Sequence, residues 1–183
     1  MSFKIDKENG EKKKKCYMIG SRRLSIAGHK PVYRKTSLPA ESSFSRVAKL
    51  RQVWWLDIRG RIETNILSPK STYGAYFVYK LDECCWAFKN KPVEFRVYFE
   101  GEEEVHEHEH GGGCKVFLDP SEDEQGLCQF RDDWWLEVEM GEFFNDGSED
   151  NRVVVCSLMG TDNYISKGGL VVEGIEFRPK SGT

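Results

Sequence analysis

The stretch that decides the fold is VEFRVYFE, residues 93–100. Its apolar side chains fall at every second position: Val93, Phe95, Val97 and Phe99. Successive side chains of a β-strand point to opposite faces of the sheet. The alternation therefore predicts an antiparallel strand with one buried face and one solvent-facing face.

Two further stretches alternate in the same way. In VWWLDIRG, residues 53–60, the expected inner face carries Trp54, Leu56 and Ile58, and the outer face carries Trp55, Asp57 and Arg59. In WWLEVEMG, residues 134–141, the inner face carries Trp134, Leu136, Val138 and Met140, and the outer face carries Trp135, Glu137 and Glu139. Weaker alternation marks residues 16–26, 71–81, 114–118, 151–158 and 168–179. Gly174 interrupts the last of these stretches and predicts a β-bulge there.

One short helix is expected in ESSFSRVAKLRQ, residues 41–52. Phe44, Val47 and Ala48 fall at helical spacing, and Ser42 or Ser43 is suited to cap the first turn. About eight strands, turn-rich joins and little helix predict an all-β fold. We expect two antiparallel sheets packed face to face, with one short helix.

Composition limits the class of protein. A chain of 183 residues suits one domain, and a net charge of −3 is too small to make nucleic acid the main partner. No apolar run approaches the roughly 20 residues of a membrane-spanning helix, and the charged start lacks the apolar core of a secretory signal. We expect a flexible charged tail over residues 1–15, a folded domain over residues 16–180, and a location in the cytosol or nucleus rather than secretion.

The sequence offers no evident catalytic constellation. The six cysteines show no CxxC spacing, which favours reduced thiols over a disulfide framework or a zinc site. No Gly-x-Ser-x-Gly elbow or phosphate-binding loop is present, and Cys84 and Cys85 have no obvious basic partner. Glu137 and Glu139 share a strand face, but alternation alone explains them as an exposed polar face. We therefore expect a binding protein and not an enzyme.

Three histidines form the weak candidate for a metal site. EVHEHEHGGG, residues 104–113, would project His106, His108 and His110 to one side of an extended segment, as zinc or nickel ligands require. The segment follows acidic residues and ends in glycines, which favours a mobile hairpin tip. Ordering it would cost about 1–2 kcal/mol per residue before any ligand bond forms. We expect a solvated loop and no cofactor.

The surplus of aromatic residues suggests a binding surface for sugars. Aromatic rings stack on the apolar face of a pyranose while acids and amides hold its hydroxyl groups. Trp55, Trp86 and Trp135 are either partly exposed rings of this kind or part of the packing between sheets. The pattern favours packing for Trp55 and Trp135 and leaves Trp86 open.

Four long blocks resemble the plant phloem protein 2 family, also called the Nictaba-like lectins. They are KKCYMIGSRRLSI (14–26), FSRVAKLRQVWWLDIRGRIETNILSPKSTYGAYFVYKL (44–81), RDDWWLEVEMGEFFN (131–145) and SKGGLVVEGIEFRPK (166–180). The resemblance implies a jelly-roll β-sandwich that binds N-acetylglucosamine oligomers, N-glycans or glycoproteins. It also implies a cytosolic, nuclear or phloem location, often as homodimers. The first block is most similar to the subgroup in which an F-box precedes the lectin domain. This chain has no room for one, so we expect either a natural member without an F-box or a fragment.

The sequence departs from the family's sugar site. Sugar-binding members carry one tryptophan after LSI and another after P-x-Y, but here no tryptophan stands near Ala27 and Arg34 takes the second position. Two family glutamates align with Val153 and Gly160. We therefore predict altered or weakened binding of chitin oligomers. The candidate carbohydrate-binding residues are Tyr33, Arg34, Asp162 and Asn163.

Three functions follow from these observations. The first is a carbohydrate-binding module of the lectin type with a modified site. The second is a protein-interaction domain that keeps the lectin fold without sugar recognition and recruits client proteins or other phloem proteins. The third, least favoured, is a metal-responsive protein that uses the three histidines.

Overall fold

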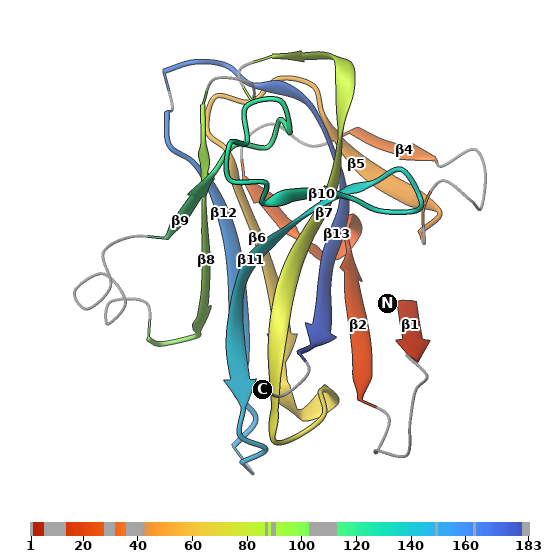
Figure 1. The fold of residues 1–183 in the computed structure, drawn as a ribbon, viewed down its shortest axis with the longest axis vertical. Helices are drawn as coiled ribbons and strands as arrows, with labels where there is room; N and C mark the ends of the chain where they lie inside the picture. Colours follow the sequence, from red (N-terminus) through yellow and green to blue (C-terminus); the bar gives the residue numbers. More distant parts are fainter. Residues whose placement is uncertain are drawn as a thin grey trace.

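The computed structural model describes residues 2–5, 14–27, 32–35, 42, 44–86, 88, 91–102, 113–148, 150–162 and 164–180. Within these ranges the chain is a sandwich of two antiparallel sheets, as the sequence predicted (Figure 1). Its helical structure there is limited to two single 3₁₀ turns, η1 (Ser21–Arg23) and η2 (Thr64–Ile66). No helix of the described part is long and apolar enough to cross a membrane.

The larger sheet has eight strands in the described ranges, and the smaller sheet has five. The larger follows the order β1-β2-β13-β7-β11-β10, with β5 beside β13 and β4 beside β5. Its strands are β1 (Ser2–Ile5), β2 (Lys15–Gly20), β4 (Val32–Lys35), β5 (Arg46–Leu50), β7 (Ser71–Trp86), β10 (Cys128–Phe130), β11 (Leu136–Asn145) and β13 (Gly168–Pro179). The smaller follows the order β3-β6-β12-β8-β9: β3 (Ser25–Ala27), β6 (Asp57–Glu63), β12 (Val153–Gly160), β8 (Val93–Phe99) and β9 (Cys114–Val116).

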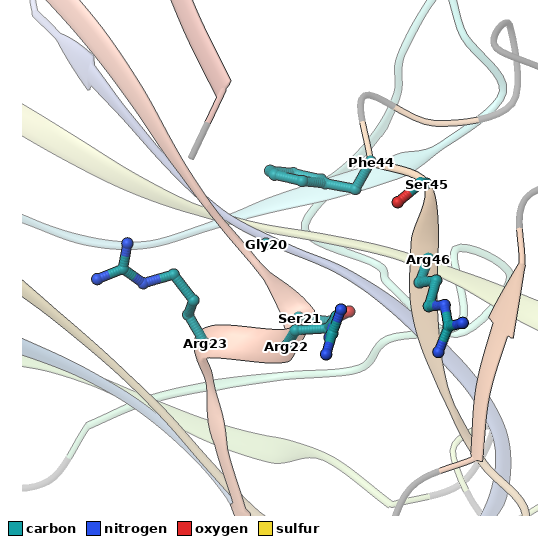
Figure 2. Close-up of a pocket in the computed structure, with 7 residues that line it drawn as sticks. All are labelled: Gly20, Ser21, Arg22, Arg23, Phe44, Ser45 and Arg46. Atoms are coloured by element: carbon teal, nitrogen blue, oxygen red, sulfur yellow. The ribbon is translucent and has the colours of Figure 1, made fainter.

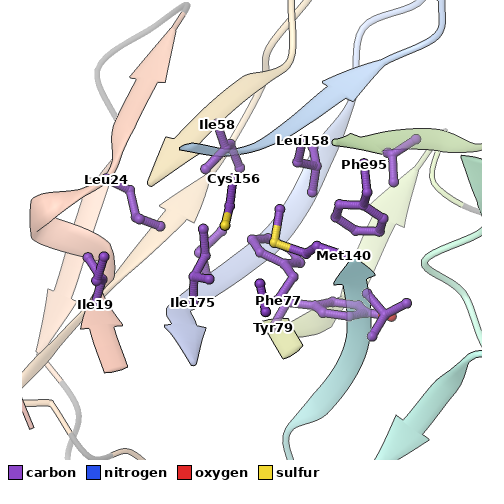
Figure 3. Packing of buried hydrophobic residues seen from close by; sticks show 14 of the residues in the cluster. Ile19, Leu24, Ile58, Phe77, Tyr79, Phe95, Met140, Cys156, Leu158 and Ile175 are labelled. Carbon is purple, nitrogen blue, oxygen red and sulfur yellow. The ribbon is translucent and has the colours of Figure 1, made fainter. Parts of the chain in front are cut away.

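The core lies between the facing surfaces of the two sheets (Figure 3). In β7 every second side chain is fully buried: Tyr73, Ala75, Phe77 and Tyr79. From β8, Phe95 packs with its ring centroid 6.0 Å from that of Phe77, so the predicted inner face of residues 93–100 is confirmed. Contacts of this kind across the two inner faces supply the hydrophobic stabilisation of the fold.

Strand β13 ties the larger sheet together. It pairs with β7 along one edge, and with first β5 and then β2 along the other. The register against β7 shifts between Val172 and Gly174, which confirms the predicted bulge. A Cβ atom on Gly174 would lie 2.2 Å from the carbonyl oxygen of Ile19, so only glycine fits there. Because β5 pairs up to Val172 and β2 pairs from Gly174, β5 continues the line of β2 along β13.

The short helix predicted over residues 41–52 is wrong. Residues Arg46–Leu50 form β5, which pairs with both β13 and β4. Val47 and Ala48 are buried in that sheet. Their spacing suits a helix as well as a strand, and the edge of β13, more than 100 residues away in the sequence, decides between the two.

The alternation predicted for the tryptophans breaks at the start of two strands. Trp54 is 51% exposed although Leu56 and Ile58 are buried as predicted, because β6 begins only at Asp57. Trp134 is 83% exposed, since it belongs to the turn before β11 and has φ of +64°. The inward orientation predicted for both side chains is therefore wrong.

The outer face of the larger sheet carries an ion-pair network. Arg131 Nη1 lies 2.9 Å from Glu137 Oε2 and 2.5 Å from Glu176 Oε2, and Arg178 Nη2 lies 2.6 Å from Glu137 Oε1. Both carboxylates are buried, so the exposed polar face predicted for Glu137 is wrong. The network connects β11 with β13 across β7, where the Arg178 guanidinium lies 3.6 Å from the ring centroid of Tyr76.

Part of the N-terminal stretch expected to be a tail is a strand. Residues Ser2–Ile5 form β1 and pair antiparallel with β2, with Ser2 opposite Met18. Residues 6–13 lie outside the described ranges. The division into a tail over residues 1–15 and a domain over residues 16–180 stays a prediction.

We predict that Arg131→Met lowers the free energy of unfolding by about 3–5 kcal/mol, because it leaves the buried carboxylate of Glu176 without its cation and leaves that of Glu137 with Arg178 alone. Arg61→Met is the matched control. Its partner Glu100 and Arg61 itself are largely exposed, so this change should cost about 0–1 kcal/mol. Urea denaturation of both variants measures the difference, and equal losses would contradict the role given to Arg131.

Candidate functional site

Exposed aromatic and apolar side chains gather at one end of the sandwich. Five of the large hydrophobic residues that are exposed in the described part lie at that end, four in connections and Trp86 as the last residue of β7: Trp54, Trp55, Trp86, Tyr164 and Ile165. We call these five the aromatic rim. Figure 1 shows this end at the top, where β7 ends and the chain passes from β12 to β13. Connections at the end of a sandwich are the usual place for binding residues.

Backbone contacts hold three distant connections together under the aromatic rim. Val53 and Lys167 exchange backbone hydrogen bonds of 2.8 and 2.7 Å, which join the β5–β6 connection to the β12–β13 connection. Gly168 pairs with Trp86, and a Cβ atom at Gly168 would lie 2.4 Å from the indole ring. The indole therefore packs on a glycine backbone, and the exposed rings have a fixed base.

A buried lysine fixes the shape of the β12–β13 connection. Lys167 is almost fully buried, and its Nζ donates hydrogen bonds to the carbonyl oxygens of Asp162 and Ile165, the latter at 3.1 Å. Burial lowers the pKa of the Lys167 ammonium. Each hydrogen bond that the ammonium donates compensates part of the cost of removing it from water, so the loop that carries Tyr164 has a defined shape.

Asp162 places a carboxylate beside the aromatic rim. Its Oδ1 accepts a 2.9 Å hydrogen bond from the backbone N–H of Tyr164, and its Oδ2 lies 3.1 Å from Lys91 Nζ. The N–H of Tyr164, followed by Lys91, lowers the pKa of the Asp162 carboxyl group. Asp162 is therefore ionised at neutral pH and offers a fixed hydrogen-bond acceptor beside the rings.

The structure brings together only part of the predicted sugar site. Asp162 lies beside the aromatic rim, in the same connection as Tyr164, whereas Asn163 lies outside the described residues. Tyr33 and Arg34 are on β4, opposite Ala48 and Val47 of β5. Strand β4 therefore flanks β5, the strand that leads into the connection with Trp54.

The two positions aligned with family glutamates lie at opposite ends of β12. Gly160 is at the rim end, where its N–H donates a 2.8 Å hydrogen bond to the carbonyl oxygen of Leu56. Val153 is at the far end, opposite Glu63 of β6. A Cβ atom at Gly160 would already lie 3.2 Å from Leu56 Cβ, so the position has little room for a longer side chain.

Sequence reasoning was right for some rim residues and missed others. Trp86 and Trp55 are exposed, so the packing favoured for Trp55 is wrong, whereas the packing favoured for Trp135 is confirmed at 2% exposure. Tyr164 and Ile165 were missed. Their segment has no periodicity, and long-range contacts such as the pairing of Val53 with Lys167 bring them to the site.

The metal hypothesis stays a prediction. His106, His108 and His110 lie outside the described residues. In the part of the chain that the structure does describe, no three His, Cys, Asp or Glu side chains gather in a metal-binding arrangement.

Two cysteines next to the core are poor nucleophiles. Burial raises the pKa of Cys128 to about 11, and burial also raises the pKa of Cys156. A reactive cysteine needs a lowered thiol pKa, because the thiolate is the attacking species. Both thiols therefore stay protonated at neutral pH and act as packing groups.

A second exposed surface lies on the hairpin between β10 and β11. Phe130 and Trp134 project there into solvent, beside an open hollow of about 430 Å³ that Asp132, Asp133 and Arg178 help to line. The turn is closed by hydrogen bonds from the Arg131 N–H to the Trp135 carbonyl (2.8 Å) and from the Trp134 N–H to the Arg131 carbonyl (3.1 Å). Its last residue, Trp134, has a left-handed backbone that favours glycine. Strain at an exposed aromatic residue is a feature of binding sites.

Comparison with known proteins identifies the family. The family model described as phloem protein 2 matches residues 14–179. The chain belongs to the phloem protein 2 family. It is 37% identical over 182 residues to F-box protein PP2-B10 of Arabidopsis thaliana, covering 96% of this chain and 63% of that protein. It is 34% identical over 187 residues to F-box protein At2g02240 of the same plant, covering 97% and 55%. The chain thus spans about three fifths of the length of these relatives.

The fold also resembles a solved structure of low sequence similarity. The crystal structure of the Podospora anserina GH26-CBM35 beta-(1,4)-mannanase matches with a TM-score of 0.50 and 9% identity, over 92% of this chain and 28% of that one. Such a likeness supports the β-sandwich architecture alone.

The strained turn yields a prediction about stability. Trp134→Gly and Trp134→Ala both remove the exposed ring, but only glycine removes the steric cost of the left-handed backbone. The glycine variant should therefore be more stable than the alanine variant by about 0.5–1 kcal/mol. Thermal and urea denaturation of the two variants measure this difference, and an alanine variant of equal or higher stability would contradict the strain.

Proposed function

We propose that this chain is a carbohydrate-binding module whose binding surface is the aromatic rim. The observation that carries the proposal is the gathering of exposed rings beside the ionised Asp162, on connections that buried contacts hold in place. Rings stack on the apolar face of a sugar, and a fixed carboxylate accepts hydrogen bonds from its hydroxyl groups. Membership in the phloem protein 2 family supports a non-catalytic binding role of the lectin type.

The favoured ligands are oligomers of N-acetylglucosamine and glycoproteins with N-glycans, as the family resemblance implies. The affinity is expected to be weak. Stacking contributes about 0.5–1.5 kcal/mol per ring beyond the area it buries, and a dissociation constant near 1 mM corresponds to about 4 kcal/mol in total. The missing family tryptophans and glutamates lower the affinity further, whereas Trp54, Trp55 and Tyr164 supply rings at other positions. We place this activity in the cytosol or nucleus, including phloem cells, and propose that the chain acts there as a homodimer.

A protein-interaction domain is the second candidate, and the β10–β11 hairpin is the observation that favours it. Phe130 and Trp134 expose apolar area away from the aromatic rim, and exposed aromatic residues commonly anchor protein partners. A chain of this kind would recruit client proteins without recognising sugars.

Calorimetry with chitotriose distinguishes the two candidates. Trp54→Ala, Trp55→Ala and Tyr164→Ala should each weaken binding about 3- to 10-fold, the equivalent of about 0.5–1.5 kcal/mol. Phe144→Ala is the matched control, because Phe144 is an exposed ring near the opposite end of β11 and should leave binding unchanged. Arg34→Ala tests in the same way whether β4 contributes to the site, and a weakening is expected.

Two results would count against the carbohydrate proposal. One is equal weakening by Phe144→Ala and by the three rim substitutions, because binding would then not be localised at the aromatic rim. The other is the absence of heat with chitotriose together with the absence of signal on a glycan array. That outcome would favour the protein-interaction domain.

A further inference from the structure

A cavity opens where β2 ends and β5 begins along β13. It measures about 160 Å³ and is lined by residues 20–23 and 44–46 (Figure 2). Its position follows from the topology, since β2 pairs from Gly174 and β5 pairs up to Val172 of the same edge. At this junction β2 has ended and β5 has not yet begun, so a gap is left between the two strands along β13.

The cavity carries three positive charges that have no acid partner within the described part of the chain. Arg22, Arg23 and Arg46 line it and are exposed, and none of them has an ion pair within the described residues. In Figure 2 the guanidinium groups of Arg22, from η1, and Arg46, from β5, lie on the same side of the close-up, while Arg23 extends the other way. Arg131 and Arg178, by contrast, are fully engaged by carboxylates. The cationic groups of the cavity are therefore available to an anion.

The wall of the cavity contains a buried hydroxyl group. Ser21 is fully buried, and its Oγ has no hydrogen-bond partner among the described residues. An unsatisfied buried polar group is unfavourable, and native proteins avoid it unless a ligand or water completes the site. A ligand oxygen at the junction would supply the missing acceptor. This observation is independent of the arginines and points to the same chemistry.

The opposite wall is apolar and fixed in place. The ring of Phe44 lies over Gly20, where a Cβ atom would come within 2.8 Å of it. The backbone N–H of Phe44 donates to Ser42 Oγ at 3.0 Å, and Ser42 Oγ donates to Glu173 Oε1 at 2.6 Å. Glu173 is buried and is not among the residues that line the cavity, so its carboxyl group does not face a ligand there.

We propose that this cavity binds a phosphate monoester carried by a polypeptide segment, such as a phosphoserine or phosphothreonine. Guanidinium groups match phosphate oxygens with paired, charge-assisted hydrogen bonds, and clusters of arginine are the common means of recognising phosphorylated segments. The volume accommodates a phosphate group and the atoms that carry it. A phosphorylated or sulfated sugar is disfavoured, because the exposed rings on which a sugar stacks are at the aromatic rim and Phe44 is only partly exposed.

The test uses the full chain and four probes: a Gly-Gly-phosphoserine-Gly-Gly peptide, the same peptide without phosphate, N-acetylglucosamine 6-phosphate and inorganic phosphate. Nitrogen-15 NMR titration follows the backbone amides of residues 20–23 and 44–46. The phosphopeptide should shift these amides and bind at least tenfold more tightly than each of the other three probes. Raising the salt concentration should weaken this binding, because the arginines are exposed.

Three variants locate the binding. Arg22→Gln combined with Arg46→Gln should weaken phosphopeptide binding at least tenfold. Ser21→Ala should weaken it about threefold while leaving the thermal midpoint unchanged or higher, because the unsatisfied hydroxyl group is removed. Arg152→Gln is the control, since it removes one positive charge next to Glu102 on another part of the molecule. It should change binding less than twofold.

Several outcomes would overturn the proposal. Equal weakening by Arg152→Gln and by the arginine pair would indicate binding to overall charge. Equal or tighter binding of N-acetylglucosamine 6-phosphate would indicate a site for an anionic sugar, and equal binding of inorganic phosphate would indicate a site for the free anion. Absence of shifts at the lining amides with the phosphopeptide would exclude the cavity. The chitotriose titration of the same variants should be unchanged, so this proposal and the carbohydrate proposal fail separately.

Discussion

The pairing of β13 on both of its edges is the constraint on which the structure depends. Its inward residues Leu170, Val172, Ile175 and Phe177 are completely buried, and its backbone is shared by β7 on one edge and by β5 and β2 on the other. The Gly174 bulge lets one strand serve two partners in line. Gly60 of β6 then lets the sheets approach, since a Cβ atom there would lie 2.8 Å from Ile175 Cδ1. Both candidate binding surfaces follow from this arrangement, because one lies at the junction of β2 with β5 and the other at the end where β13 begins.

How far the sequence predicts this structure depends on whether a feature is local. The inward face of β8 and the Gly174 bulge could be predicted, because alternation and glycine placement are properties of a single strand. The nature of residues 46–50 could not, because Val47 and Ala48 suit a helix until the edge of β13 is present. The aromatic rim was predicted least well. The segment of Tyr164 is held there by long-range contacts such as the bridge between Val53 and Lys167, two residues whose proximity no pattern in either segment indicates.

The two proposed surfaces share a physical connection in β5. Its first residue, Arg46, lines the cavity between β2 and β5. Its last residue, Leu50, leads to Val53 and Trp54 at the aromatic rim. The strand is short, and its hold on the larger sheet is the pairing with β4 and β13. A ligand that binds only the folded state stabilises it in proportion to its affinity and concentration. Occupation of either surface therefore stabilises the same strand.

At the aromatic rim, the contacts that fix the loops differ from the side chains that would contact a ligand. The fixed parts are backbone hydrogen bonds and a buried lysine, and neither depends on which side chains project outward. Outward side chains of the connections, such as Tyr164, can therefore differ between relatives without disturbing the sheets, as is usual for binding loops on a rigid framework. This explains how a chain of the phloem protein 2 family keeps the fold while the family's tryptophan and glutamate positions hold other residues. The loss of those positions moves the expected contacts with a sugar to other rings of the same framework, so specificity, and not stability, is the property expected to change.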